Sequence, residues 1–182
     1  MAFLQTIRSL FSPAAARREP VVEVLAPAPP DTAYGLARLH GGNIKELVIL
    51  NQRCFTNGDS YSRQTFNYLL DEPRTLGYQV RTESGEMAAF AFVMTDLDSG
   101  SAHLTTIGVA PEHRRRGLAT KLLKHVERML QAKGIGTLML EVRVGNRGAQ
   151  ELYERAGYSI VQRIEKYYGN GEDGYLMIKS LV

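Results

Sequence analysis

Hydrophobic positions from residue 34 onward switch repeatedly between the two-residue period of strands and the 3.6-residue period of helices. Strands are predicted at 34–40, 77–83, 86–95, 101–109, 137–143, 158–167 and 175–181. Helices are predicted at 43–55, 62–72, 117–133 and 146–156. Helices that interrupt runs of neighbouring strands in this order indicate an α+β fold built on a mixed sheet.

Residues at the predicted helix ends support these bounds. Asn43 and Glu46 have the spacing of a capping box, in which the two side chains satisfy backbone N–H groups of the first turn. Ser62 stands directly before the second helix, where its hydroxyl can accept from the first turn. Gly134 follows the third helix, and glycine is common just after a helix C-terminus.

The first 34 residues differ from the rest of the chain. Apolar side chains recur there on one helical face, at Phe3, Leu4, Ile7, Leu10 and Phe11, and an Ala/Pro-rich linker follows. Gln5 and Arg8 break this apolar run, so we do not expect a secretion signal. A short helix that docks on a partner or a membrane surface fits the pattern, and so does a disordered tail, the simpler interpretation. We therefore divide the chain into an extension at 1–34 and one domain at 35–182.

Composition narrows the class of protein. The chain has 182 residues, of which 44% are hydrophobic and 23% charged, as is usual for a globular domain. Cys54 is the only cysteine, which excludes an intramolecular disulfide and a thiolate metal cluster and favours a cytoplasmic location. The net charge of +3 indicates solubility rather than nucleic-acid binding, which needs a longer basic stripe. No apolar run reaches the length of a membrane span.

A basic turn joins the strand that ends at Val109 to the long helix after it. Its pattern is Arg114, then Gly117, then Ala119, with Arg115 and Arg116 between them. Small or absent side chains allow a ligand to approach the backbone, and the helix start offers unpaired N–H groups and a positive dipole end. The turn therefore predicts a pyrophosphate-binding site.

Three blocks of the sequence carry further information. They are the strand and turn at 104–119, the segment Leu140-Glu141-Val142-Arg143 followed by Asn146, and the pattern of Ala149, Leu152, Tyr153, Gly157 and Tyr158. In this order and spacing they resemble the GNAT family of N-acetyltransferases over residues 35–182. The resemblance implies the GNAT fold, which is a mixed, mostly antiparallel sheet of six to seven strands flanked by about four helices. It also implies acetyl-CoA as co-substrate and no metal.

The end of the chain is similar to one group within this family, the protein N-terminal acetyltransferases, which include those that act on ribosomal-protein alanines. The similar segments are Lys166-Tyr167-Tyr168 and 171–177, together with Tyr61-Ser62 and Thr65-Phe66 earlier in the chain. This resemblance implies that the acceptor is the N terminus of a protein, such as a ribosomal protein. It also implies that Tyr61, Tyr167 and Tyr168 line the acceptor groove, although Tyr167 and Tyr168 could instead be packing aromatics of an edge strand.

The resemblance assigns the coenzyme contacts to particular positions. The sheet should open beside the strand that ends at Val109, so that the pantetheine arm can bond free backbone groups. These contacts fall on Ile107, Gly108, Val109, Arg114, Arg115, Arg116, Gly117, Leu118, Ala119 and Asn146. Asn146 would bond the pantetheine arm, and its simpler role is to cap the helix that it begins.

Two residues carry the implied chemistry. Glu141 stands in the middle of a buried strand, an unusual place for a carboxylate, and the resemblance makes it the general base. The alternative for Glu141 is a cross-strand ion pair. Tyr153 is the implied general acid for the leaving thiolate, or else a core tyrosine. His103 is a rival base that would otherwise be structural.

These expectations combine into an acetyl-CoA-dependent enzyme that acetylates a protein N-terminal α-amine by direct attack in a ternary complex. An α-amine has a pKa of about 7.7–8.0 and a lysine side chain one of about 10.4, so the α-amine is the easier acceptor to deprotonate. The alternatives are acetylation of a lysine or a small amine, and a non-catalytic acyl-CoA-binding adaptor.

Overall fold

The computed structural model describes residues 26–56 and 58–182. The apolar stripe predicted near the N terminus lies outside these residues. Within the described part of the chain, no helix is long and apolar enough to cross a membrane.

Seven strands form one mixed sheet in the order β1-β2-β3-β4-β5-β7-β6. The strands are β1 (Tyr34–Arg38), β2 (Thr75–Thr82), β3 (Met87–Asp96), β4 (Ser101–Val109), β5 (Thr137–Arg143), β6 (Ser159–Ile164) and β7 (Gly174–Ser180). Neighbours are antiparallel except β4 and β5, which run parallel. The predicted α+β fold with six to seven strands is confirmed.

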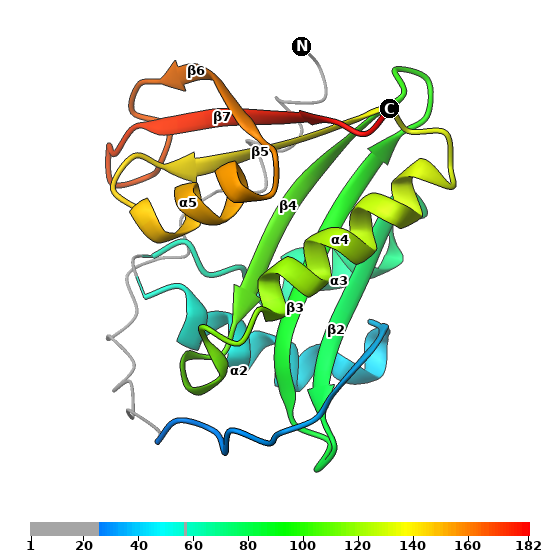
Figure 1. Ribbon diagram of the computed structural model, residues 1–182, viewed down its shortest axis with the longest axis vertical. Coiled ribbons are helices and arrows are strands. Elements are labelled where there is room, and N and C mark those ends of the chain that lie inside the picture. The colour runs from blue at the N-terminus through cyan, green and yellow to red at the C-terminus, as the bar shows by residue number, and fades with distance from the viewer. Residues whose placement is uncertain (1–25, 57) are drawn as a thin grey trace.

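Helices cover both faces of the central strands. Figure 1 shows α4 (Leu118–Gln131) in front of β2, β3 and β4, with α2 (Ile44–Cys54) and α3 (Arg63–Asp71) behind them. The fourth helix, α5 (Arg147–Arg155), follows β5. Strand β3 serves both layers because its side chains alternate. Ala89, Ala91 and Val93 pack in the cluster that contains α4, whereas Phe90, Phe92 and Met94 pack in the cluster that contains α2 and α3.

The helix-start predictions had different outcomes. Ser62 caps α3, since its hydroxyl oxygen accepts from the Thr65 N–H at 3.1 Å. The capping box of Asn43 and Glu46 is wrong, because Asn43 instead accepts from the His40 N–H and closes a short 3-10 turn at Gly41–Asn43. The Glu46 carboxylate instead accepts from the Met87 N–H at 2.7 Å, so it bonds the start of β3 and not the start of the helix.

The sheet splits open between β4 and β5. Their parallel pairing joins only Ser101–His103 to Thr137–Met139, after which the two strands diverge (Figure 1). The rest of β4 keeps its pairing with β3 as far as Val109. The opening predicted beside the end of β4 is therefore confirmed, and among the described strands none pairs with this edge of β4 beyond His103.

Candidate active site

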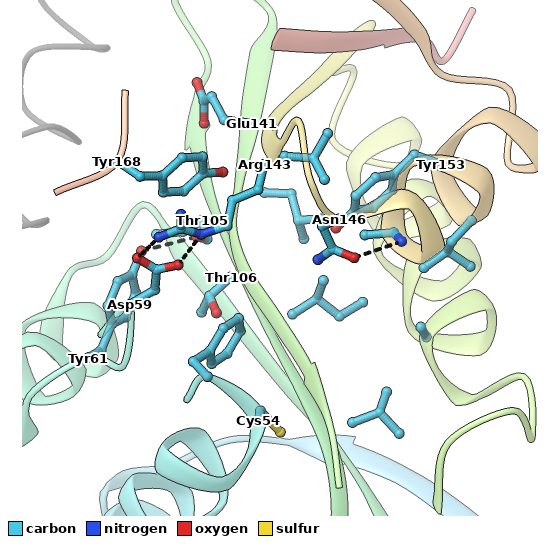
Figure 2. Close-up of a pocket in the computed structure, with 18 of the residues that line it drawn as sticks. Cys54, Asp59, Tyr61, Thr105, Thr106, Glu141, Arg143, Asn146, Tyr153 and Tyr168 are labelled. Atoms are coloured by element: carbon cyan, nitrogen blue, oxygen red, sulfur yellow. Dashed lines mark hydrogen bonds and ion pairs between the residues drawn. The ribbon is translucent and has the colours of Figure 1, made fainter. Parts of the chain in front are cut away.

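A cavity of about 280 Å³ lies between the diverging strands. Residues predicted for the base, acid, coenzyme and acceptor roles meet in its lining, namely Tyr61, Ile107, Val109, Ala119, Glu141, Asn146, Tyr153, Tyr167 and Tyr168. Figure 2 shows labelled lining residues around one cavity, with Thr105 and Thr106 from β4 and others from β5, α5 and the segment after α2. The lining does not include Gly108, Gly117, Leu118 or the three arginines of the turn.

Glu141 and His103 lie at the point where β4 and β5 separate. The carboxylate and Nε2 of the imidazole are joined by a hydrogen bond of 2.6 Å, and their side chains are only 4% and 1% exposed. Burial of a carboxylate is costly unless it is bonded in this way. The two residues that the sequence presented as rival bases are therefore partners, and Glu141 has both the cavity position and the cross-strand contact that were predicted as alternatives.

Tyrosines surround the Glu141 carboxylate. Burial, and then the negative charge of Glu141, raise the pKa of Tyr61 and Tyr167. Burial also raises the pKa of Tyr168. The Tyr61 hydroxyl donates to the Thr105 carbonyl at 3.1 Å, which ties the segment after α2 to β4. These phenols stay protonated at neutral pH and can act as hydrogen-bond donors.

Arg143 connects three segments at this end of the cavity. Its guanidinium donates to both carboxylate oxygens of Asp59, at 2.6 and 2.5 Å, and to Glu172 at 2.5 Å. It also lies 3.9 Å from the centre of the Tyr168 ring (Figure 2). The segment after α2, the end of β5 and the loop between β6 and β7 are thus held together by one buried cation.

Neither Arg143 nor Asp59 was among the site residues predicted from the sequence. A signal for Arg143 was present, because Glu141 and Arg143 are two residues apart and so share one face of a buried strand. Nothing local marked Asp59, which lies 84 residues away.

Tyr153 and Asn146 enter the cavity from α5 and its start. The Tyr153 side chain is buried, which raises its pKa, and its ring lies edge-on to Tyr158 at 5.7 Å. Asn146 accepts from the Ala149 N–H at 3.1 Å and so caps α5, which was its simpler predicted role. Figure 2 shows its amide nitrogen on the cavity side, where it could donate to a ligand. A contact with a coenzyme remains a prediction.

The end of β4 alternates between cavity and core. Ile107 and Val109 line the cavity, whereas a Cβ on Gly108 would lie 2.6 Å from a ring carbon of Phe90. Glycine at this position is therefore needed for packing against β3, whatever its backbone contributes to a ligand.

The basic turn offers a ligand backbone N–H groups at the start of α4, whereas its arginine side chains do not line the cavity. Gly117 has φ +74° and begins α4, and the first helical bond runs from the Lys121 N–H to the Gly117 carbonyl. The N–H groups of 118–120 therefore have no partner within the helix. The Leu118 side chain is buried in the core, while the small Ala119 lines the cavity. This helix end can hold an anion through its N–H groups and dipole.

The three arginines of this turn differ in their exposure and contacts. Arg114 and Arg115 are exposed, and Arg115 has the left-handed φ of +63°. The Arg116 guanidinium donates to the carbonyl of Pro29 at 2.6 Å and to that of Ala28. The Arg116 guanidinium is therefore already engaged, whereas the N–H groups of 118–120 are open to a pyrophosphate. The predicted contact between Arg116 and a pyrophosphate would require these bonds to break.

A cluster of potential metal ligands lies outside the cavity lining. Ligand atoms of Glu86, Glu112 and His113 lie within 4.8 Å of one another. Both oxygens of Glu112 already accept from Arg53, at 2.7 and 2.5 Å, and Nδ1 of His113 is bonded to the Tyr34 hydroxyl at 2.9 Å. An ion pair and a hydrogen bond therefore already occupy Glu112 and His113. The expectation that the enzyme needs no metal stays a prediction.

Comparisons with known proteins agree with this architecture. Residues 44–158 match the sequence profile of the acetyltransferase (GNAT) family. The ribosomal protein bS18-alanine N-acetyltransferase of Escherichia coli (strain K12) is 40% identical over 108 residues, which cover 59% of this chain and 70% of that protein. The N-alpha-acetyltransferase daf-31 of Caenorhabditis elegans is 32% identical over 121 residues, covering 64% and 66% respectively.

Solved structures show the same fold. The ribosomal-protein-S18-alanine N-acetyltransferase from Escherichia coli superposes with a TM-score of 0.74 at 32% identity, over 82% of this chain and 94% of that one. Arabidopsis thaliana NAA60 in complex with acetyl-CoA superposes with a TM-score of 0.70 at 16% identity, over 81% and 98%. This chain is therefore an acyltransferase and belongs to the GNAT family of acetyltransferases.

Proposed function

We propose that this acyltransferase uses acetyl-CoA to acetylate the N-terminal α-amine of a protein, by direct attack in a ternary complex. The observation that carries the proposal is the cavity that extends from Ala119, at the start of α4, to the buried carboxylate of Glu141. A polyanionic carrier and an amine acceptor need these two features together. The names of the bacterial and nematode relatives, both acetyltransferases and the former specific for a ribosomal protein alanine, support the choice of acceptor.

The residues at the α4 end fit acetyl-CoA. The N–H groups at 118–120 and the positive end of the α4 dipole suit a pyrophosphate. The edge of β4 that has diverged from β5 offers backbone groups to a pantetheine arm, and Asn146 offers its amide nitrogen. Bound acetyl-CoA would supply an activated acetyl thioester at the Glu141 end of the cavity.

In this proposal, Glu141 removes the proton of the attacking ammonium, directly or through a water. The α-amine loses its proton near neutral pH, since its pKa is about 7.7–8.0, so a modest base is enough. His103 holds the carboxylate at 2.6 Å and fixes its orientation. Tyr153 donates to the departing sulfur as the C–S bond breaks. Burial keeps its hydroxyl protonated, which is the form that a general acid needs.

The acceptor would enter between Tyr61, Tyr167 and Tyr168. Burial raises the pKa of each phenol, so all three hydroxyls keep their protons, and Tyr168 can donate to a carbonyl oxygen of a peptide backbone. The protons of Tyr61 and Tyr167 already go to the Thr105 carbonyl and the Glu141 carboxylate, so these two hydroxyls can accept from peptide N–H groups. Such contacts would hold an extended N terminus with its amine beside Glu141. The proposal does not select the first residues of the acceptor.

A peptide screen tests the proposal. Peptides with free N termini, including those of ribosomal proteins, are incubated with labelled acetyl-CoA beside the same peptides with blocked N termini and an internal lysine. Label on the free N termini alone is the expected result. Label on the lysine or only on small amines would replace the proposed acceptor, and coenzyme binding without label on any amine would indicate an adaptor.

A further inference from the structure

The described chain begins with a segment that lies against the basic turn. We call residues 26–34 the strap. In Figure 1 the strap (blue) runs along the lower end of the sheet, close to the turn that joins β4 to α4, before the chain continues into β1. Ala28 of the strap is partly buried there, although its neighbours are exposed.

Hydrogen bonds tie the strap to the residues on both sides of the turn. The Ala28 N–H donates to the Glu112 carbonyl at 3.1 Å, and the Arg116 guanidinium donates to the carbonyls of Ala28 and Pro29. At the other end of the strap, Lys121 donates to the Tyr34 carbonyl at 2.9 Å. The strap therefore spans the turn from Glu112 to the first coil of α4.

A ring contact completes the attachment. The Tyr34 hydroxyl is bonded to Nδ1 of His113 at 2.9 Å, and the two rings meet edge to face at 5.6 Å. His113 is only 2% exposed and directly precedes the arginines of the turn, so the strap also contacts the buried base of the turn.

The turn needs external support because its backbone is strained. Arg115 and Gly117 both have left-handed φ values, of +63° and +74°, and a non-glycine residue persists in that region only when its surroundings hold it there. The strap bonds Glu112 and His113 before Arg115, and Arg116 and Lys121 after it. It uses the carbonyl of Glu112 and side chains of the turn, and its bonds do not involve the N–H groups of 118–120.

The strap does not compete with a ligand for the cavity. Among the described residues, those that line the cavity include Ala119 and the end of β4 but none from 26–38. The strap therefore supports the turn from outside the cavity and does not block the cavity itself.

We propose that the strap holds the turn in the conformation that binds the coenzyme, and that Arg116 is its anchor, a positioning residue rather than a phosphate ligand. This inference rests on the proposed acetyl-CoA site. It assigns a function to the strap, and it makes the affinity for the coenzyme depend on whether the strap is attached to the turn.

Full-length variants on both sides of the contact test the proposal. Arg116→Gln removes the anchor, and Ala28→Pro removes the N–H that bonds Glu112 without touching the turn. Arg128→Gln, in the last turn of α4 and away from the strap, matches the charge change. Ala26→Pro matches the backbone change, because Ala26 makes no hydrogen bond with the described part of the chain.

Hydrogen–deuterium exchange is followed in peptides covering the strap and the turn, without ligand, and acetyl-CoA affinity is measured by calorimetry. Arg116→Gln and Ala28→Pro should each speed exchange in both segments and weaken acetyl-CoA binding roughly fivefold or more, as expected for the loss of one bond. The double variant should be little worse than the poorer single variant, because both release the same strap. The two control variants should behave like the wild type.

Kinetics separate positioning from a general loss of structure. With an acceptor found in the peptide screen, both variants should raise the KM for acetyl-CoA while kcat and the KM for the peptide stay near wild type, and Arg116→Lys should restore part of the affinity. A lower Tm with unchanged acetyl-CoA affinity would reduce the strap to a stabilising element and overturn the proposal.

Other outcomes also decide the matter. Weaker binding in Arg116→Gln but wild-type binding in Ala28→Pro would make Arg116 a phosphate ligand. Tighter binding in Ala28→Pro would make the strap an inhibitor. If the wild type does not bind acetyl-CoA, the proposed function fails, whereas unchanged exchange of the turn in both variants contradicts the strap itself.

Discussion

The two ends of the cavity are built in different ways. The end beside Glu141 is made of side chains that β4, β5 and two loops bring together, and its charges are buried in pairs such as Arg143 with Asp59. The end beside α4 is made of one continuous stretch of backbone, and of the neighbouring arginines Arg114 and Arg115 are exposed while Arg116 bonds the strap. A carrier shared by many enzymes can be held by backbone, whereas the choice of acceptor needs side chains. Changes at the two ends should therefore separate chemistry and acceptor recognition from coenzyme binding.

The largest effect is expected at the Glu141 end. Glu141→Gln removes the proposed base but can still accept from His103, so turnover should fall by roughly 10²–10⁴-fold with the fold and acetyl-CoA affinity retained. Steady-state kinetics and calorimetry on the same preparation measure this. If the variant turns over at the wild-type rate, Glu141 has only its cross-strand contact.

Tyr153→Phe tests the acid with a nearly isosteric change. The buried ring and its contact with Tyr158 are kept, so we expect a similar loss of roughly 10²–10⁴-fold in kcat without loss of stability. Thermal melting provides the control for folding. Wild-type rates in both this variant and Glu141→Gln would contradict the proposed chemistry as a whole.

At the other end, Gly117→Val should weaken acetyl-CoA binding on the order of 10- to 100-fold, since a branched residue at φ +74° is strained by roughly 1–3 kcal/mol and narrows the phosphate site. Gly134→Val is the matched control. It has φ +76° and equally open space around its Cβ, but lies after α4 at the end away from the turn. Calorimetry should show reduced affinity only for Gly117→Val, and equal losses in both would reduce the effect to stability.

A smaller effect is expected for Asp59→Asn. The substitution keeps the shape but removes the charge that Arg143 contacts through two bonds, so the segment after α2 should loosen. We expect the KM for the acceptor peptide to rise about tenfold, the value of one bond to a charged group, with the KM for acetyl-CoA unchanged. An equal rise in both KM values would mean that the two ends are not independent.

The last effect concerns stability at high pH. Burial raises the pKa of Tyr61, Tyr167 and Tyr168 above the value of about 10 that an unfolded tyrosine has. Above that pH the unfolded chain loses protons that the folded chain keeps, so the free energy of unfolding should fall as pH rises, by about 1.4 kcal/mol per pH unit for each such tyrosine. Urea unfolding between neutral pH and pH ~11 measures it. Tyr167→Phe should make the fall shallower, and an unchanged slope would contradict burial of this phenol.

Much of the fold followed from local patterns. The bounds of β4 and β5 match their predictions, because alternation over buried strands is a strong signal. The predicted strand at 158–167 ends at Ile164 instead, since Tyr167 and Tyr168 belong to the loop that reaches the cavity. Glu46 fits a helix-start pattern, but its carboxylate accepts from the Met87 N–H at the start of β3. Local spacing does not reveal this partner, which lies far away in the sequence.

The sequence by itself determined the parts of the site that are continuous along the chain. The strand that ends at Val109 and the helix start at 118–119 follow from the local sequence, because backbone conformation and helix dipoles are local properties. The left-handed Arg115 between them is the exception, since the strap contacts the residues around it. Only the tertiary structure decided which side chains meet. His103 and Glu141 are 38 residues apart, Asp59 and Arg143 are 84 apart, and Ala28 and Arg116 are 88 apart. Such pairs form only because the strands diverge and the loops bring distant segments together, and local spacing in the sequence does not contain that information.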